Sequence, residues 1–362
     1  MAEEIVNNKR GLWKGALSIL KSGFNHRFHG FAQIILMIFL SLLATGGCGD
    51  QADYSAYLYE VKDDNLRQAI ITSFEKSGLA FQDIYKLESI RVDSVPVTTL
   101  EGIEKFTELK ELSIIYAGVT DIGPLQNLTK LEYLSLFSNE ISDISVLKNL
   151  HYLRGLTLSC NYISDLSPVV ECGNLEHLLA GLNNIETLPE FENLTKLKSL
   201  ELSKNKIRDI QGLAVLKSLT FLVLDANQIA DITPLAGMRI ETLRICTNKL
   251  TNLDLLSEMT TLMNLHFGAN RIEDFSFVTP LVNLEVFNAE DTGISDLTIL
   301  EGKEELETVN LSNNQISDVS RLLKLKKLQR VYLEKNPLSV KSIEEYIPQL
   351  EKQLVGFRVL EY

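Results

Sequence analysis

Hydrophobic residues return at fixed positions along most of the chain, and their spacing predicts the architecture. The stretch LTKLEYLSLFSNEISDISVLKN, from Leu128 to Asn149, matches the stretches 22 residues before and after it, which begin at Phe106 and Leu150. Self-similarity at a fixed period of this length indicates one structural unit that is stacked many times. We therefore expect a solenoid, in which each unit contacts mainly its two neighbours.

Each position within one unit predicts a local structure. Leu134 and Leu136 alternate with other residues, and this period of two places both leucines on one face of a short strand. Asn139 follows where the strand must end, and its amide can both donate to and accept from backbone groups that a turn leaves unpaired. Ser142 and Asp143 carry oxygens that can cap a tight 3₁₀ turn. One coil cannot bury its own leucines, so stability requires the stack.

The recurring pattern LxxLxxLxLxxNxIxDIxxL resembles the short bacterial leucine-rich repeats of the internalin family. We expect an α/β fold, a leucine-rich-repeat solenoid that forms a curved right-handed coil with helical caps at both ends. A parallel β-sheet should line its concave face, and short 3₁₀ or turn segments should form its convex face. Twelve coils of about 22 residues are expected between residues 84 and 336.

A few positions depart from the pattern. Val95 and Thr292 replace the turn asparagine, and Ala180 stands in the strand of a coil that later carries Leu188-Pro189, so we expect that strand to be less tightly filled. Leu222 and the equivalent Leu243 are 21 positions apart, and a shortened convex segment should absorb the missing residue without disturbing the strands.

A solenoid end exposes unpaired strand edge and apolar core, so both ends need covers. Residues 62–83 are expected to form the N-terminal helical cap and residues 337–362 the C-terminal cap. The first places Leu66, Ala69, Ile70 and Phe74 on one helical face and ends at Gly78, whereas the second has Ile343, Tyr346, Ile347 and Leu350 at helical spacing.

The N-terminal segment has the features of an export signal. Residues 1–47 are basic overall, and Phe31 to Ala44 is an uncharged apolar run of 14 residues, which suits a signal peptide better than a membrane-spanning helix. The small residues before Cys48 resemble the lipobox of bacterial lipoproteins, although Thr45 stands where that motif prefers leucine. The resemblance implies lipidation of Cys48, with residues 48–61 as a tether. An uncleaved anchor and a simple secretory signal are the alternatives.

Charge narrows the range of partners. The formal net charge is −13, and residues 1–47 are net basic, so the remainder of the chain is still more acidic. Such a surface repels nucleic-acid phosphates, so we expect no nucleic-acid partner. No cofactor is implied by any motif in the sequence.

Candidate chemistry is sparse. His177 and His266 should point to the concave face but lie four coils apart, which is ~19 Å at the usual strand spacing, so they cannot share a metal ion. We expect solvated or partner-contacting histidines, no metal site and no catalytic residue. Cys172 occupies a core position, and the odd number of further cysteines is no disulfide framework. The adjacent acids Glu290 and Asp291 are expected to be solvated.

The concave face is the candidate binding site, because exposed aromatic and branched side chains lose hydration free energy unless a partner covers them. The alternative is that these side chains pack on one another across strands. The candidate residues are Ile115, Tyr116, Tyr133, Phe137, His177, Leu179, Phe221, Val223, Arg244 and His266.

The sequence thus predicts a monomeric, non-enzymatic protein at the bacterial cell surface, outside the cytoplasm and lipid-anchored to the membrane or, less favoured, secreted. It would bind a protein or glycan ligand, and resemblance to internalins implies a host or neighbouring-cell surface protein as one candidate. Two other classes stay open. One is an intracellular scaffold resembling the phosphatase-binding protein with 22-residue repeats, and the other is a structural envelope protein without a discrete ligand.

Overall fold

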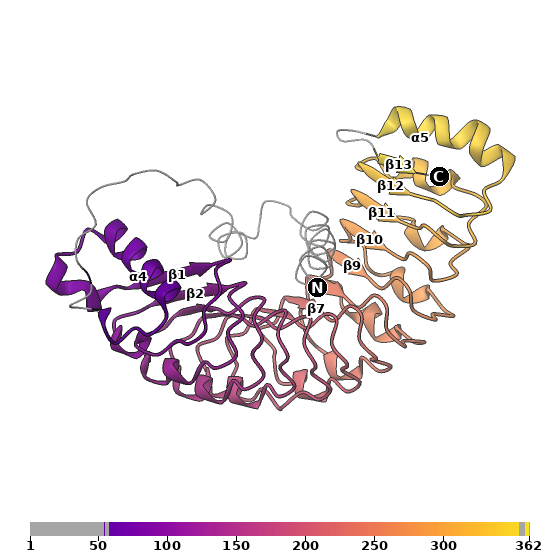
Figure 1. The fold of residues 1–362 in the computed structure, drawn as a ribbon. Coiled ribbons are helices and arrows are strands. Elements are labelled where there is room, and N and C mark those ends of the chain that lie inside the picture. Colours follow the sequence, from indigo (N-terminus) through magenta and orange to yellow (C-terminus); the bar gives the residue numbers. More distant parts are fainter. Residues whose placement is uncertain (1–53, 55–57, 355–358, 362) are drawn as a thin grey trace. The chain divides into compact units, whose positions relative to one another are not determined.

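The computed structural model describes residue 54, residues 58–354 and residues 359–361. Residues 54–362 form one compact unit, distinct from residues 1–53. Its parallel sheet has 13 strands in sequential order, so each strand pairs with the one before and the one after it (Figure 1). The strands are β1 (Ser89–Asp93), β2 (Glu111–Ile115), β3 (Tyr133–Ser135), β4 (Gly155–Thr157), β5 (His177–Leu179), β6 (Ser199–Glu201), β7 (Phe221–Val223), β8 (Thr242–Arg244), β9 (Asn264–His266), β10 (Val286–Asn288), β11 (Thr308–Asn310), β12 (Arg330–Tyr332) and β13 (Val359–Glu361).

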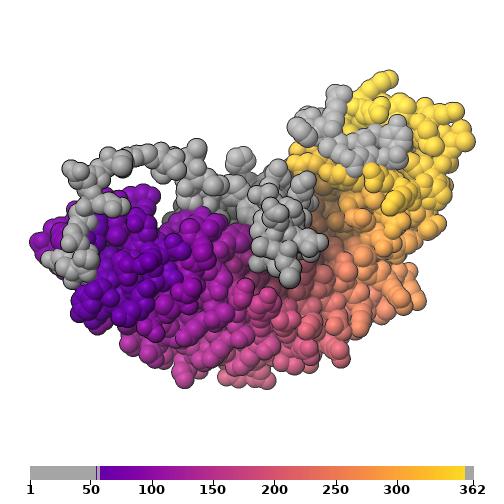
Figure 2. All heavy atoms as spheres, viewed as in Figure 1, coloured from indigo at the N-terminus to yellow at the C-terminus, as the bar shows by residue number. Residues whose placement is uncertain are grey.

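Short 3₁₀ segments face the sheet across a single apolar core, as the repeat pattern predicts. Consecutive coils pack without a break from the indigo to the yellow end of the unit (Figure 2). The 3₁₀ helices are η2 (Phe81–Lys86), η3 (Ile103–Lys105), η4 (Gly123–Asn127), η5 (Ser145–Asn149), η6 (Ser167–Glu171), η7 (Gln211–Leu213), η8 (Thr233–Leu235), η9 (Asp254–Glu258), η10 (Ser276–Val278), η11 (Thr298–Leu300) and η12 (Ser320–Lys324). The predicted leucine-rich-repeat solenoid is confirmed.

The helix α4 (Asp64–Ser77) covers the first coil. Leu66, Ile70 and Phe74 are buried, and Gly78 ends the helix in the left-handed conformation with φ 70°, as the sequence predicts. Asp63 caps the helix by accepting from the Leu66 N–H at 2.9 Å, and its second oxygen accepts from the Thr98 N–H at 2.8 Å. One carboxylate therefore ties the capping helix to the repeats.

The C-terminal cap is helical but differs in its first turn. A π-helical segment, η13 (Ser342–Tyr346), runs into α5 (Ile347–Gln353), where Ile347 and Leu350 are buried as expected. Ile343 is 46% exposed, so its expected place on the buried face was wrong. A π-turn holds more residues than an α-turn, and this rotates Ile343 away from the face that an α-helical spacing gives it.

The irregular coils keep the strand ladder intact. Leu222 pairs with Leu243 across β7 and β8, so the convex side absorbs the missing residue as predicted. In the coil with Leu188-Pro189, no helix separates β5 from β6, and Ala180 and Phe191 are both fully buried. This extended segment passes so close to the next coil that a Cβ on Gly212 would lie 2.1 Å from the Pro189 carbonyl oxygen.

A ladder of asparagine amides, most of them buried, joins most coils to the previous one. Asn161 donates through Nδ2 to the carbonyl oxygens of Leu136 and Leu158, both at 2.9 Å, and its Oδ1 accepts from the Ile141 N–H at 3.0 Å. The same three-way arrangement recurs at Asn139, Asn183, Asn205, Asn227, Asn248, Asn270, Asn314 and Asn336.

The residue before each turn asparagine adopts a positive φ, for example 55° at Ser138 and 56° at Leu182. Residues other than glycine rarely adopt this conformation, which costs of order 1 kcal/mol or more. The amide bonds to two carbonyls and one N–H compensate for this strain, since they satisfy groups that the sharp turn removes from the strand ladder.

We predict that Asn161→Asp destabilises the protein about as strongly as Asn161→Ala, by about 2–4 kcal/mol, because a carboxylate keeps the acceptor for Ile141 but cannot donate to Leu136 and Leu158. Urea unfolding followed by circular dichroism would measure the change. Asn161→Thr is the matched control, because Thr292 at the equivalent turn keeps one of the three bonds by donating to the Ala289 carbonyl oxygen at 2.8 Å. A smaller loss of stability for Asn161→Asp than for Asn161→Thr would contradict the proposed role of the asparagine amides.

Candidate ligand-binding face

Every strand presents alternate side chains to the concave side, opposite the leucines. The parallel register stacks equivalent positions from coil to coil, so that Phe221 pairs with Ser199 and Thr242, and Arg244 with Val223 and His266. Neighbouring side chains in such a row are about 4.8 Å apart, close enough for large groups to touch. The concave face is therefore a continuous surface rather than a set of separate loops.

Aromatic and apolar side chains occupy the half of this face that β2–β7 form. Tyr116 and Phe137 pack edge to face with ring centroids 5.4 Å apart. Tyr133, His177 and Phe221 are half-buried along the strand starts, and Leu179 is half-buried beside them. Each of these side chains keeps part of its surface open to solvent while its neighbours hold it in place.

Three candidate residues are not exposed as expected. Ile115, Val223 and His266 are only 4%, 2% and 4% exposed. Val223 lies between the longer side chains of Glu201 and Arg244 in the register, and Arg244 is likewise the neighbour of His266. Long side chains on adjacent strands cover shorter ones, so Val223 and His266 shape the surface from beneath instead of meeting solvent.

The two histidines differ in environment. His266 is buried, and this desolvation, with the charge of Arg244, lowers its pKa to about 3, so the ring is neutral at physiological pH. The expectation of a solvated histidine was therefore wrong for His266. Burial also lowers the pKa of His177, less strongly. The strands of the two residues, β5 and β9, are four apart in the sheet, as predicted.

A buried charged cluster lies at the centre of the face, and sequence reasoning missed it except for Arg244. The Arg244 Nε donates to Asp225 Oδ2 at 2.9 Å, with side chains only 13% and 12% exposed. Asp225 Oδ1 accepts from the Cys246 N–H at 2.7 Å. One coil earlier, Glu201 accepts from the N–H and hydroxyl of Ser203 and from an N–H of the preceding coil.

Burial raises the pKa of Glu201, and the negative charge of Asp225 adds to the effect. The hydrogen bonds from Ser203 oppose this shift without cancelling it. The cluster fixes the centre of the face by ionic and hydrogen bonds, since each acid is held by donors from its own or a neighbouring coil. The cue in the sequence was an acid or base at positions in or just after the strand that carry uncharged residues in most other coils.

Three cysteines lie within the described residues. Cys172 is buried, and desolvation raises its pKa to about 12, as expected for a core residue. Cys160, Cys172 and Cys246 are free thiols. Among residues 58–354, no group of three His, Cys, Asp or Glu side chains is arranged to hold a metal ion. Cys48 and the export segment lie outside the described residues, and none of the described helices has both the length and the hydrophobicity to cross a bilayer.

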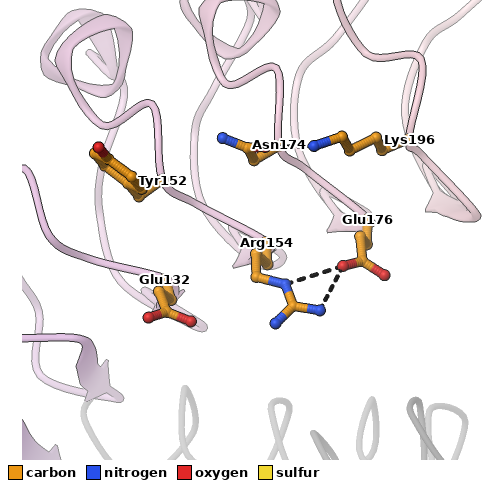
Figure 3. A pocket seen from close by; sticks show the side chains of 6 residues that line it. All are labelled: Glu132, Tyr152, Arg154, Asn174, Glu176 and Lys196. Atoms are coloured by element: carbon orange, nitrogen blue, oxygen red, sulfur yellow. Dashed lines mark hydrogen bonds and ion pairs between the residues drawn. The ribbon is translucent and has the colours of Figure 1, made fainter.

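A shallow pocket of about 460 Å³ lies beside the face, at the edge where the strands begin. Glu132, Tyr152, Arg154, Asn174, Glu176 and Lys196 line it (Figure 3). Arg154 donates through Nε and Nη2 to one oxygen of Glu176, at 2.9 and 2.6 Å. Hydrogen bonds from Lys198 and Arg154, together with their charges, lower the pKa of Glu176 to about 2. Sequence analysis had singled out none of the residues at this edge.

The architecture and the face define a class of protein, the leucine-rich-repeat binding scaffold. The family described as "Leucine Rich repeats (2 copies)" matches residues 107–149, 129–171, 173–215, 195–237 and 304–348. No curated protein matches the sequence closely enough to count as a relative.

Solved structures narrow the class further. An internalin (inlF) from Listeria monocytogenes is 30% identical over 84% of this chain and 96% of that chain, with a TM-score of 0.70. The functional domain of InlJ from the same species is 23% identical over 81% and 73%, with a TM-score of 0.52. A plant peptide hormone receptor, RGFR1 in complex with RGF2, is 21% identical over 71% and 49%, with a TM-score of 0.53. The latter two share the fold alone.

The chain belongs to the internalin family of leucine-rich-repeat proteins. Proteins of this family are binding scaffolds rather than enzymes, and this chain is a protein-binding scaffold of the same kind.

We predict that Arg244→Met destabilises the fold by about 3–5 kcal/mol, because it leaves the buried Asp225 without its charged partner. Adding Asp225→Asn to that variant should recover part of the loss, since the remaining amide oxygen can still accept from Cys246. Urea unfolding of Arg244→Met, of Asp225→Asn and of the double variant gives the coupling free energy between the two side chains, expected at about 1–3 kcal/mol. Simple additivity of the single effects would show that the pair is not coupled.

Proposed function

We propose that the protein is exported, anchored to the membrane through a lipidated Cys48, and binds a protein ligand with its concave face. The observation that carries the binding proposal is the half of the face built by β2–β7, where partly exposed aromatic and apolar side chains lie in register. Aromatic residues and arginine are the usual anchors of protein interfaces, since they supply large contact area.

The rigidity of the face supports the same proposal. The Tyr116–Phe137 pair and the Asp225–Arg244 ion pair hold their side chains in fixed positions before any ligand arrives. Binding to such a surface loses little conformational entropy, so more of the contact free energy contributes to affinity. A ligand with an apolar surface patch, such as the exposed face of a folded protein, fits these residues best.

The surface location rests on the N-terminal segment and on the family. The apolar run that ends before Cys48 favours export, and internalins act outside the cell that makes them, so a host or neighbouring-cell surface protein is one candidate ligand. A second fatty chain at Cys48 would make the anchoring stable, because one chain alone binds membranes only marginally.

The binding proposal is tested by chemical cross-linking and capture with the full chain in nonionic detergent, from extracts of surface proteins. The variant with Tyr133→Glu, Phe137→Glu and Phe221→Glu places three charges on the concave face. We expect it to lose the ligand that the unchanged protein captures. The matched control carries Tyr162→Glu, Val215→Glu and Val282→Glu, three exposed positions outside the strands, and should keep the ligand.

Each variant must first show the unfolding midpoint of a folded solenoid. A ligand retained by the concave variant and lost by the control would move the binding site off the concave face. Capture of a glycan instead of a protein would change the ligand class, and no specific capture by any version would favour a structural envelope role.

The anchoring proposal is tested by growing cells with a labelled fatty acid. Cys48→Ser should abolish labelling of the protein and release it from the membrane fraction, because the serine hydroxyl cannot replace the acylated thiol. Cys160→Ser is the matched control and should leave labelling unchanged. Labelling that persists in the Cys48→Ser variant would exclude lipidation at this residue.

A further inference from the structure

Charges alternate strictly along the edge where the first six strands begin. The residue before each strand is in turn Glu88, Lys110, Glu132, Arg154, Glu176 and Lys198. Backbone hydrogen bonds of 2.7–2.9 Å join each of these residues to the preceding one, so the order is fixed by the coil stack. Beyond β6 the alternation stops, since Thr220, Glu241 and Met263 come next. We call the six residues the charge ladder.

The ladder is complementary to its own reverse. If the ladder is laid antiparallel against a second copy of itself, each acid meets a base. Glu88 then lies opposite Lys198, Lys110 opposite Glu176, and Glu132 opposite Arg154. A two-fold axis between Glu132 and Arg154 would therefore bring every acid of one ladder opposite a base of a second copy. A two-fold interface requires this self-complementarity of one surface patch.

Ion pairs within one chain leave the centre of the ladder incomplete. Lys110 pairs with Glu88 at 2.8 Å, while Arg154 and Lys198 both pair with Glu176 at 2.6 Å. Glu132 forms no ion pair with any residue in the described part of the chain. The third guanidinium nitrogen of Arg154, which is not bound to Glu176, is directed to the Glu132 side of the pocket (Figure 3).

Glu132 is thus the one ladder residue without an ion pair in the described part of the chain, Arg154 keeps a free guanidinium nitrogen beside it, and these are also the two residues that a two-fold axis would pair. Tyr152 borders the same pocket and is 64% exposed, so an apolar ring is available for contact near the axis. The ladder lies at the strand starts, beside the concave face.

We propose that the charge ladder is a self-association surface, on which a second copy of this chain docks antiparallel with Glu132 of one copy against Arg154 of the other. This inference is independent of the concave-face proposal and revises the expectation of a monomer. Exposed ion pairs are individually weak, so the association should be salt-sensitive, with a Kd in the micromolar range.

The test is sedimentation velocity of the full chain in nonionic detergent at about 50 µM, where a micromolar Kd gives mostly dimer. We expect a dimer at about 0.05 M NaCl and at least a tenfold weaker association at about 0.5 M. Glu132→Arg and Arg154→Glu each place like charges opposite one another at two symmetric positions, so each variant alone should be monomeric. Their equimolar mixture should form a mixed dimer, because each like-charged pair becomes an opposite pair.

Glu305→Arg is the matched control, because Glu305 pairs with Lys327 at 2.6 Å outside the ladder, and this variant should still dimerise. Unchanged unfolding midpoints of the variants would show that folding is not the cause of a change. A monomeric unchanged protein at low salt, dimers of either single variant alone, or no mixed dimer from the two variants would each overturn the proposal. These outcomes leave ligand capture by the concave face unaffected, so the two proposals fail separately.

Discussion

Hydrogen bonding by the buried turn asparagine is the constraint on which the rest of the structure depends. Each strand is only a few residues long, and the chain must leave it through a residue with positive φ. Without the asparagine amide, the backbone groups at that turn would be buried and unpaired, which costs of order 1–3 kcal/mol for each group. The amide satisfies groups of its own coil and of the preceding one, so it stabilises the turn and couples the coils.

Coupling between coils determines what the concave face can do. Because the register is the same from β1 to β12, side chains at equivalent positions form rows whose spacing is set by the sheet. Function then depends on which residues stand in those rows. Aromatic residues in the rows of β2–β7 form a half-exposed surface, whereas Glu201, Asp225 and Arg244 lock the centre. The solenoid determines where each side chain lies, and the residues in each row determine what the surface can bind.

The sequence predicted the fold in detail and the site only in part, for physical reasons. The alternating leucines and the turn asparagine recur at fixed separations along the sequence. The strand register, including the pairing of Leu222 with Leu243, could therefore be derived from the sequence. The burial of Val223 and His266 depends on how far the side chains of Glu201 and Arg244 reach across the sheet, and a one-dimensional pattern does not contain that information. Ile343 was misplaced because a π-turn replaced the assumed α-helical spacing.

Hydrogen exchange of the full chain, followed residue range by residue range in low denaturant, tests the central claim most directly. If the asparagine amides couple the coils, the N–H groups that they accept, such as those of Ile141, Ile163 and Ile207, should exchange as slowly as the strand amides of the same coils. Exchange of these turn amides orders of magnitude faster than that of the strands would show that the turns open independently, and would contradict the account of a rigid, prebuilt face.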